Sequence, residues 1–258
     1  MTSEQFHTRD TLRRSAVILG QLALWTCAVG VMLLICSCTR EKMPGKIVNP
    51  YLNEQVWAVA PFKNESGTTT ANGITLADRL TQALDADVYG ISTVPVNRVL
   101  STMAERHIDS INNLQQAATL ARQMGVDGII LGEISAYDPY DPPVYGVSLL
   151  LVQVNRPLGA MASFDPHDLM RMYTDVSLAN TGANNGPTSV KLLLNAADGD
   201  VRAAVKQYAE GRSDPQTALG WERYIKSMEL FTQFASHRLV SELLDRERLR
   251  VSRVSAGR

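Results

Sequence analysis

The sequence predicts an α/β fold in which a small mixed sheet carries helices packed on it and is followed by a helical C-terminal extension. Between residues 56 and 155, short apolar runs of strand length alternate with segments whose apolar residues recur at helical spacing. This alternation is typical of a sheet covered by helices. Apolar residues then recur at helical spacing through residues 219–249, which predicts a long helix in the C-terminal extension.

The first half of the domain is expected to contain two strands and two helices. Residues 56–60 begin a buried strand, and the polar turn 61–67 ends it. Apolar residues recur at helical spacing through residues 72–86, which predicts an amphipathic helix packed on that strand. Residues 88–94 form a second short strand, and a helix follows directly after Pro95, a residue favoured in a first helical turn.

The second half of the sheet follows a third helix. This helix runs from about Asn113 to Met124, and Gly125 suits a left-handed C-terminal cap. Residues 126–135 are almost continuously apolar, as in strands at the centre of a sheet, and residues 144–154 supply the next strand.

The chain beyond residue 155 is expected to contain several shorter elements before the long helix. They are one or two helical turns at 165–173, a flexible loop at 179–187, a strand at 190–194 and a helix at 198–211. An aromatic stripe on the long helix is a candidate for either core packing or a groove for a partner, and core packing is the commoner use of such spacing. The stripe consists of Trp221, Tyr224, Phe231 and Phe234.

The N-terminal 38 residues resemble an export signal that ends at a lipid-attachment cysteine. Arg13 and Arg14 precede an uncharged apolar run from Ala16 to Ile35, which is the pattern of a secretory signal peptide. The sequence Ile35-Cys36-Ser37-Cys38 then resembles the lipobox of bacterial lipoproteins, in which a small residue precedes the cysteine that is diacylated. This resemblance implies palmitate-type lipidation of Cys38. Cys36 fits less well because the bulky Ile35 precedes it.

Two alternatives remain for this segment. The apolar run is long enough to form an uncleaved transmembrane anchor, and the paired arginines also occur in twin-arginine signals. The three cysteines, Cys27, Cys36 and Cys38, all lie in this segment, so the remaining 220 residues have no disulfide framework.

The expected organisation is a signal peptide at 1–37, a tether at 38–55, an α/β domain at 56–155, a loop and helical extension that completes the domain at 156–249 and a flexible tail at 250–258. Without residues 1–37, 22 of the 25 basic and 24 of the 26 acidic residues remain. Because the two signs nearly cancel, the chain lacks the excess of basic residues that is typical of nucleic-acid binding. The arginines of the tail region, Arg246 to Arg253, suit either a solvated frayed end or contact with anionic lipid or phosphate.

An ordered set of motifs resembles one superfamily of envelope proteins. The sequence Trp-Ala-Val-Ala-Pro-Phe-Lys-Asn-Glu-Ser-Gly at 57–67 resembles its opening pattern VAVxPFxNxSG, residues 94–99 its VPxxRV step, and residues 121–133 its glycine-containing strand element. The superfamily includes CsgG, LpoB and the N-terminal domain of TolB. The resemblance implies a scaffold that acts through protein contact, without catalytic residues. The polar segment 155–187 lacks the two long alternating strands of a CsgG-type channel.

Several motif residues can also be explained by their effect on the backbone alone. Pro61 ends the pairing of its strand, and Asn64 and Gly67 suit a turn.

No catalytic motif emerges from the sequence, and we expect neither a cofactor nor a metal. The histidines of the expected mature chain, His107, His167 and His237, are far apart in sequence. Asp165-Pro166-His167-Asp168 contains metal-ligand residue types but no convincing fourth ligand, and an Asp-Pro helix start is the alternative. Asp138 and Asp141 have the residue type for weak calcium binding but also suit ordinary turns.

These observations predict a non-enzymatic, lipid-anchored envelope protein that faces the periplasm and binds or assembles other envelope proteins. Thr39 replaces the aspartate that commonly retains lipoproteins in the inner membrane, which favours the outer membrane. The alternative is an oligomeric component of an outer-membrane secretion apparatus, and an enzyme of unknown type is a third hypothesis. The expected partner contacts are three aromatic residues around the proline-rich turn 138–143, because aromatic residues are enriched at interfaces: Tyr137, Tyr140 and Tyr145.

Overall fold

A mixed sheet forms the centre of the computed structural model, which describes residues 46–156, 158, 163–171, 186–212 and 218–256. The strand order is β5-β2-β6-β7-β8, and β3 pairs with β6 beyond the end of β2. The pairs formed by β2 and β3 are parallel, whereas β6, β7 and β8 are antiparallel. The strands are β2 (Gln55–Val59), β3 (Lys63–Asn64), β5 (Ile91–Val94), β6 (Gly128–Asp138), β7 (Val144–Gln153) and β8 (Thr188–Asn195).

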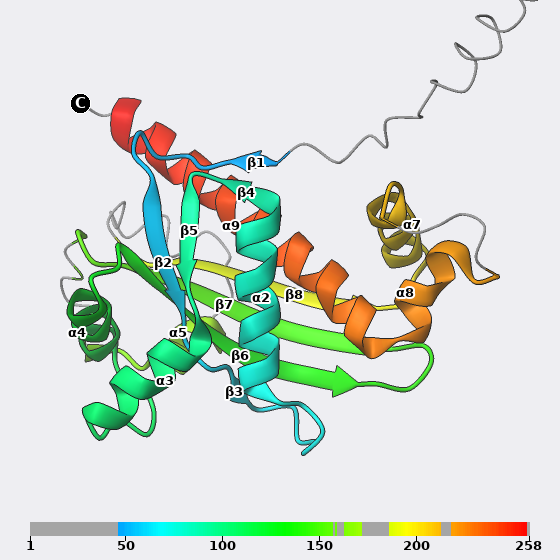
Figure 1. Ribbon diagram of the computed structural model, residues 1–258, viewed down its shortest axis with the longest axis horizontal. Coiled ribbons are helices and arrows are strands. Elements are labelled where there is room, and N and C mark those ends of the chain that lie inside the picture. Colours follow the sequence, from blue (N-terminus) through cyan, green and yellow to red (C-terminus); the bar gives the residue numbers. More distant parts are fainter. Residues whose placement is uncertain (1–45, 157, 159–162, 172–185, 213–217, 257–258) are drawn as a thin grey trace, which may run out of the picture. The chain divides into compact units, whose positions relative to one another are not determined.

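Helices cover both faces of this sheet (Figure 1). One face packs against α2 (Gly73–Asp87), α7 (Gly199–Ala209), α8 (Arg223–Lys226) and α9 (Met228–Ala256). The other face packs against α3 (Val96–Glu105), α4 (Leu114–Met124) and α5 (Pro166–Arg171). The mixed α/β class predicted from the sequence is therefore confirmed.

Strand alternation explains how one sheet serves two cores. Trp57 and Val59 of β2 are fully buried on the α2 and α9 side, whereas Ala58 and Ala60 are buried on the α3 and α4 side. Successive side chains of a strand point to opposite faces, so the near-continuous apolar runs of β2, β6 and β7 are needed to fill both cores.

Local signals in the sequence set several element boundaries. The side chain of Asn72 accepts hydrogen bonds from the backbone N–H groups of Ile74 and Thr75 and so caps α2. Gly125 has φ 69° at the C-terminus of α4, and Gly67 has φ 76° in the turn after β3. The predicted left-handed cap and the predicted turn are both confirmed.

Two segments differ from the sequence expectations. The expected strand 88–94 is divided at Gly90, where φ is 82°, into β4 (Val88–Tyr89) and β5. The expected long helix from Leu219 is divided into a 3-10 turn (Gly220–Glu222), α8 and α9, because Ser227 has an extended backbone between α8 and α9. Helix α9 continues to Ala256, through most of the stretch expected to be a flexible tail.

The region expected to complete the domain contributes a strand to its sheet and a helix to its core. Strand β8 pairs with β7 as an edge of the sheet, and α9 packs beside α2. The predicted strand at 190–194 and the predicted helix at 198–211 are confirmed as β8 and α7. Among the described residues, no helix combines the length and apolar character needed to cross a bilayer. The predicted signal peptide and Cys38 lie outside the described residues.

Candidate functional site

The N-terminal segment of the described chain, residues 46–54, is bound to the domain. Its strand β1 (Ile47–Val48) pairs in parallel with β4. The side chain of Asn49 donates a 2.6 Å hydrogen bond to the carbonyl oxygen of Gly90, and a Cβ atom at Gly90 would lie 2.4 Å from that amide nitrogen. Glycine at position 90 therefore allows the close approach of Asn49, and part of the stretch expected to be a tether is structured.

A buried carboxylate fastens this segment to the C-terminal helix. Glu247 of α9 is fully buried and accepts hydrogen bonds from the hydroxyl of Tyr51 at 2.7 Å and from Nη2 of Arg156 at 2.7 Å. Arg250 donates from Nη2 at 2.9 Å, and the hydroxyl of Thr188 also donates to the carboxylate. We call these five residues the Glu247 cluster.

The ionisation of the Glu247 cluster follows from its geometry. Burial alone would raise the pKa of Glu247, but the hydrogen bonds and charges of Arg250 and Arg156, with the bond from Thr188, hold that pKa below its ordinary value of 4.5. Burial, and then the charge of Glu247, raise the pKa of the Tyr51 hydroxyl. Tyr51 therefore stays a neutral donor beside an ionised carboxylate.

The Glu247 cluster joins four parts of the chain that are distant in sequence. Arg156 lies just after β7, Thr188 begins β8, and Nη1 of Arg156 also donates to the carbonyl oxygen of Gly186 at 3.2 Å. The cluster was not predicted from the sequence. Tyr51 falls in the stretch expected to be a tether, and the sequence does not indicate a partner for Glu247. An acidic residue among apolar positions of a helix was the one available signal.

A second polar cluster borders a cavity of about 240 Å³ near β3. Glu133 of β6 is 4% exposed, and its Oε2 lies 3.0 Å from Nδ1 of His167, which lines the cavity. Nε of Arg171 lies 3.5 Å from the other carboxylate oxygen of Glu133. Apolar side chains form most of the remaining wall: Ala60, Pro61, Phe62, Ile74, Leu100, Met103, Ile111 and Leu131.

This cluster resembles an acid–base pair in one respect, since a buried carboxylate orients an imidazole. The hydroxyl of Ser110 also lines the cavity, but it donates to Asn112 Oδ1 at 2.8 Å and so has a partner other than His167. The backbone N–H of His167 donates to Asp165 Oδ1 at 2.8 Å, at the start of α5. The helix-start interpretation of Asp165-Pro166-His167-Asp168 is therefore confirmed.

The histidines do not converge on one site. His167 pairs with Glu133, whereas Nδ1 of His237 lies 2.7 Å from Oδ2 of Asp87, a carboxylate that Arg212 also contacts. His107 follows α3 with φ 54°. Among the described residues, no group of three or more histidine, cysteine, aspartate or glutamate side chains has an arrangement that could hold a metal ion.

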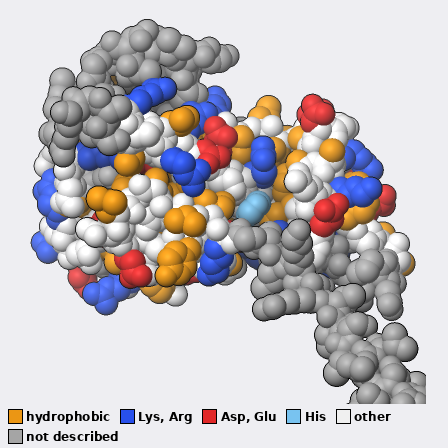
Figure 2. Space-filling view, turned by 90° about the horizontal axis from the view of Figure 1, so that it is seen from above, with side chains coloured by type: hydrophobic (Ala, Val, Ile, Leu, Met, Phe, Trp, Pro, Cys, Tyr) orange, Lys and Arg blue, Asp and Glu red, His pale blue; other side chains and the backbone are white. Residues whose placement is uncertain are grey.

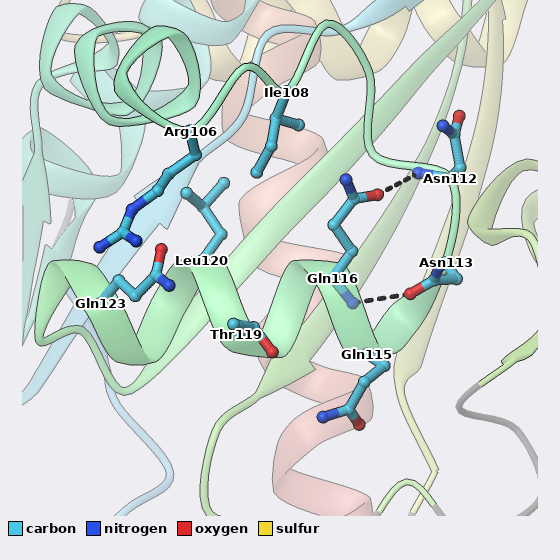
Figure 3. Close-up of a pocket in the computed structure, with 9 residues that line it drawn as sticks. All are labelled: Arg106, Ile108, Asn112, Asn113, Gln115, Gln116, Thr119, Leu120 and Gln123. Atoms are coloured by element: carbon cyan, nitrogen blue, oxygen red, sulfur yellow. Dashed lines mark hydrogen bonds between the residues drawn. The ribbon is translucent and has the colours of Figure 1, made fainter.

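A larger hollow of about 480 Å³ lies between the end of α3 and α4 (Figure 3). Asn113 Oδ1 accepts from the backbone N–H of Gln116, and Gln116 Oε1 accepts from the backbone N–H of Asn112. This reciprocal arrangement closes the N-terminus of α4 in the manner of a capping box. The polar side chains at this end of the hollow therefore have a structural role.

The predicted partner contacts lie in different environments. Tyr140 is 80% exposed at the turn between β6 and β7, where its backbone N–H donates to Asp138. Tyr145 is 2% exposed and packs edge-on against the half-buried Tyr137, with ring centroids 6.2 Å apart. Tyr145 is thus a core residue unavailable to a partner. Asp141 forms an ion pair with Lys226.

The aromatic stripe of the C-terminal region belongs to the core. Tyr224 is 5% exposed, and Phe231 and Phe234 are fully buried on the α2 and α9 side of the sheet. Trp221 packs at the edge of this core, with the guanidinium of Arg202 5.5 Å from its ring centroid. The structure therefore favours core packing over a partner groove.

Comparisons with known proteins give similarities of fold. No protein-family model and no curated protein matches the chain. The C-terminal domain of LpoB from Salmonella enterica is 15% identical with a TM-score of 0.32, over 40% of this chain and 73% of that one. The lipoprotein GNA1162 from Neisseria meningitidis is 15% identical with a TM-score of 0.34, over 60% and 98%. The PelC dodecamer from Paraburkholderia phytofirmans is 20% identical with a TM-score of 0.28, over 45% of this chain and 71% of that one. These similarities concern the fold.

Proposed function

We propose that this chain is a lipid-anchored envelope protein, attached through Cys38, whose α/β domain faces the periplasm as a non-enzymatic protein-binding or assembly module. The observation that carries the proposal is the apolar export segment that ends in Ile35-Cys36-Ser37-Cys38. Thr39 after the cysteine favours the outer membrane as the destination.

The geometry of the N-terminal segment supports a domain held near the lipid. Lys46 is the first described residue and lies eight positions after Cys38. An extended chain spans at most about 3.6 Å per residue, so the anchor lies within about 29 Å of Lys46. Pairing of β1 with β4 and the hydrogen bond from Tyr51 to Glu247 hold the following residues on the domain. The domain therefore operates close to the membrane surface.

The role as a binding module is supported by what the motif residues do. Asn64 donates to the carbonyl oxygens of Thr68 and Ala71 and accepts from Ser66, which closes the turn after β3. Gly132 lies against Phe62, where a Cβ atom would come within 2.2 Å of the ring. These residues build a scaffold, and in the superfamily they resemble, such a scaffold acts through protein contact.

Lipid attachment is tested by metabolic labelling with an alkyne fatty acid, followed by separation of inner and outer membranes. We expect label on the wild-type protein in the outer-membrane fraction, label on Cys36→Ala and none on Cys38→Ala. Equal labelling of Cys38→Ala and wild type would contradict attachment at this cysteine.

The size of the detergent-extracted protein separates the module from the alternative, an oligomeric component of a secretion apparatus. A monomer or dimer by light scattering supports a recruiting or regulating module. A ring-sized particle would contradict this module and support the oligomeric component of a secretion apparatus.

A further inference from the structure

We propose that one side of the domain rests on the phospholipid leaflet that holds the anchor, an inference that rests on the proposed function. This surface, the anchor-side patch, comprises four exposed apolar side chains and two cations. The apolar side chains are Val48, Leu52, Tyr89 and Leu249, and the cations are Lys46 and Arg248.

Strand pairing and one hydrogen bond bring three of the four apolar side chains together, and Leu52 follows the end of β1 four positions along the chain. Val48 and Tyr89 are register partners in the parallel pair of β1 and β4. Their neighbours Ile47 and Val88 pack into the core, so strand alternation turns Val48 and Tyr89 outward. Nη2 of Arg248 donates to the carbonyl oxygen of Val48 at 3.3 Å, which places the end of α9, including Leu249, beside β1.

These four apolar side chains have high exposed fractions. Leu52 is 104% exposed, Tyr89 66%, Val48 62% and Leu249 58%. Single exposed apolar residues are normal on a protein surface, whereas a contiguous apolar patch rimmed by polar residues marks an interaction site. Figure 2 looks onto the side of the domain on which β1 and β4 lie in Figure 1, and shows hydrophobic side chains interspersed with basic and acidic ones there.

The length of the preceding chain identifies the membrane as the occupant. Seven residues separate Cys38 from Lys46, and they include Arg40, Glu41 and Lys42, which together carry a net charge of +1. The patch begins where this short linker ends, so an acylated Cys38 keeps Val48 and Leu52 close to the lipid headgroups. Basic residues beside the anchor are attracted to anionic phospholipid, and tyrosine is favoured at the boundary between headgroups and acyl chains.

The N-terminal end of helix α2 provides a control position for the proposed orientation of the domain on the leaflet. Tyr89 follows the C-terminal end of α2, and Ile74, which is 45% exposed, lies at its N-terminal end (Figure 1). A helix of 15 residues is about 22 Å long at 1.5 Å per residue. Ile74 is thus an exposed apolar side chain well separated from the patch.

The test measures the position of a fluorescent label on the full chain in vesicles of phosphatidylethanolamine and phosphatidylglycerol. The variants Leu52→Cys and Ile74→Cys each offer one free thiol, because Cys27 and Cys36 precede the processing site and the mature N-terminal Cys38 is alkylated on sulfur. We expect nitroxide-labelled lipids to quench most of the fluorescence at position 52 and little at position 74, and aqueous iodide to show the reverse order.

Two results would overturn the proposal. Equal lipid quenching at positions 52 and 74 would show that the patch does not face the leaflet. Protection of position 52 from iodide without lipid quenching would show that a second copy of the chain or another protein covers it.

The intact mass of each labelled sample separates this inference from the proposed function. Absence of lipid on Cys38 would refute lipid attachment but leave the patch testable, because an apolar run retained up to Ile35 also ends close to Lys46. In that case Cys27, Cys36 and Cys38 are replaced by serine before labelling, and the same comparison of positions 52 and 74 decides whether the patch faces the leaflet.

Discussion

The variant Glu247→Gln tests the Glu247 cluster most sharply. Glutamine keeps the size of the side chain but removes the negative charge that faces Arg156 and Arg250. The Arg156 side chain is 9% exposed, so its charge loses its counter-ion where water cannot fully replace it. Removing one partner of a buried ion pair costs about 3–5 kcal/mol, and because Arg250 is more exposed we expect a loss of about 3 kcal/mol in the free energy of unfolding.

Urea unfolding followed by circular dichroism measures this loss. For a domain of this length, 3 kcal/mol corresponds to a decrease of roughly 6–12 °C in Tm. The matched control is Glu242→Gln on the same helix, because Glu242 is 41% exposed and pairs with Arg246 at 2.9 Å. An exposed pair of this kind contributes about 0.3–0.5 kcal/mol. A loss below about 1 kcal/mol for Glu247→Gln, similar to that of the control, would refute the reasoning.

Three further predictions follow from the same structure. Because the folded-state pKa of Glu247 is lowered, its contribution to stability is complete above its ordinary value of 4.5 and is lost as the pH falls through the lowered pKa. Urea midpoints of the wild type should therefore fall more steeply below pH 4.5 than those of Glu247→Gln, and parallel curves would count against this assignment. Gly73→Ala should cost about 3 kcal/mol, because its Cβ atom would lie 2.0 Å from the carbonyl oxygen of Phe62. The control Gly199→Ala meets nothing within 4 Å and should be neutral or stabilising by about 0.5 kcal/mol, so similar thermal melts for the two variants would contradict the close approach. Tyr51→Phe removes the hydroxyl that donates to Glu247 and should accelerate amide hydrogen exchange in residues 46–54, and unchanged protection there would show that β1 and Asn49 suffice.

The elements predicted well from the sequence are those whose signals are local. Apolar periodicity predicts α2, α3 and α4 close to their observed bounds, and Gly125 marks the end of α4. The near-continuous apolar runs identify β6 and β7 because both faces of these strands are buried.

The features that were not predicted from the sequence depend on contacts between distant residues. Strand β1 has only two residues and lies in the stretch expected to be a tether, so no periodicity identifies it, and its pairing with β4 brings together positions that are 41 residues apart. The nearness of Tyr145 to a turn wrongly predicts a surface position, whereas pairing of β6 with β7 places it opposite Tyr137 and directs it into the core. Glu133 carried a usable signal, since a carboxylate inside an apolar strand needs a partner.

The most direct test of the central claim is the intact mass of the protein extracted from membranes, with the wild type measured beside Cys38→Ala and Cys36→Ala. We predict a diacylated or triacylated chain that begins at Cys38 for the wild type and for Cys36→Ala, and the absence of this species for Cys38→Ala. An unmodified full-length mass in all three samples would contradict lipid attachment and identify the apolar segment from Ala16 to Ile35 as an uncleaved anchor.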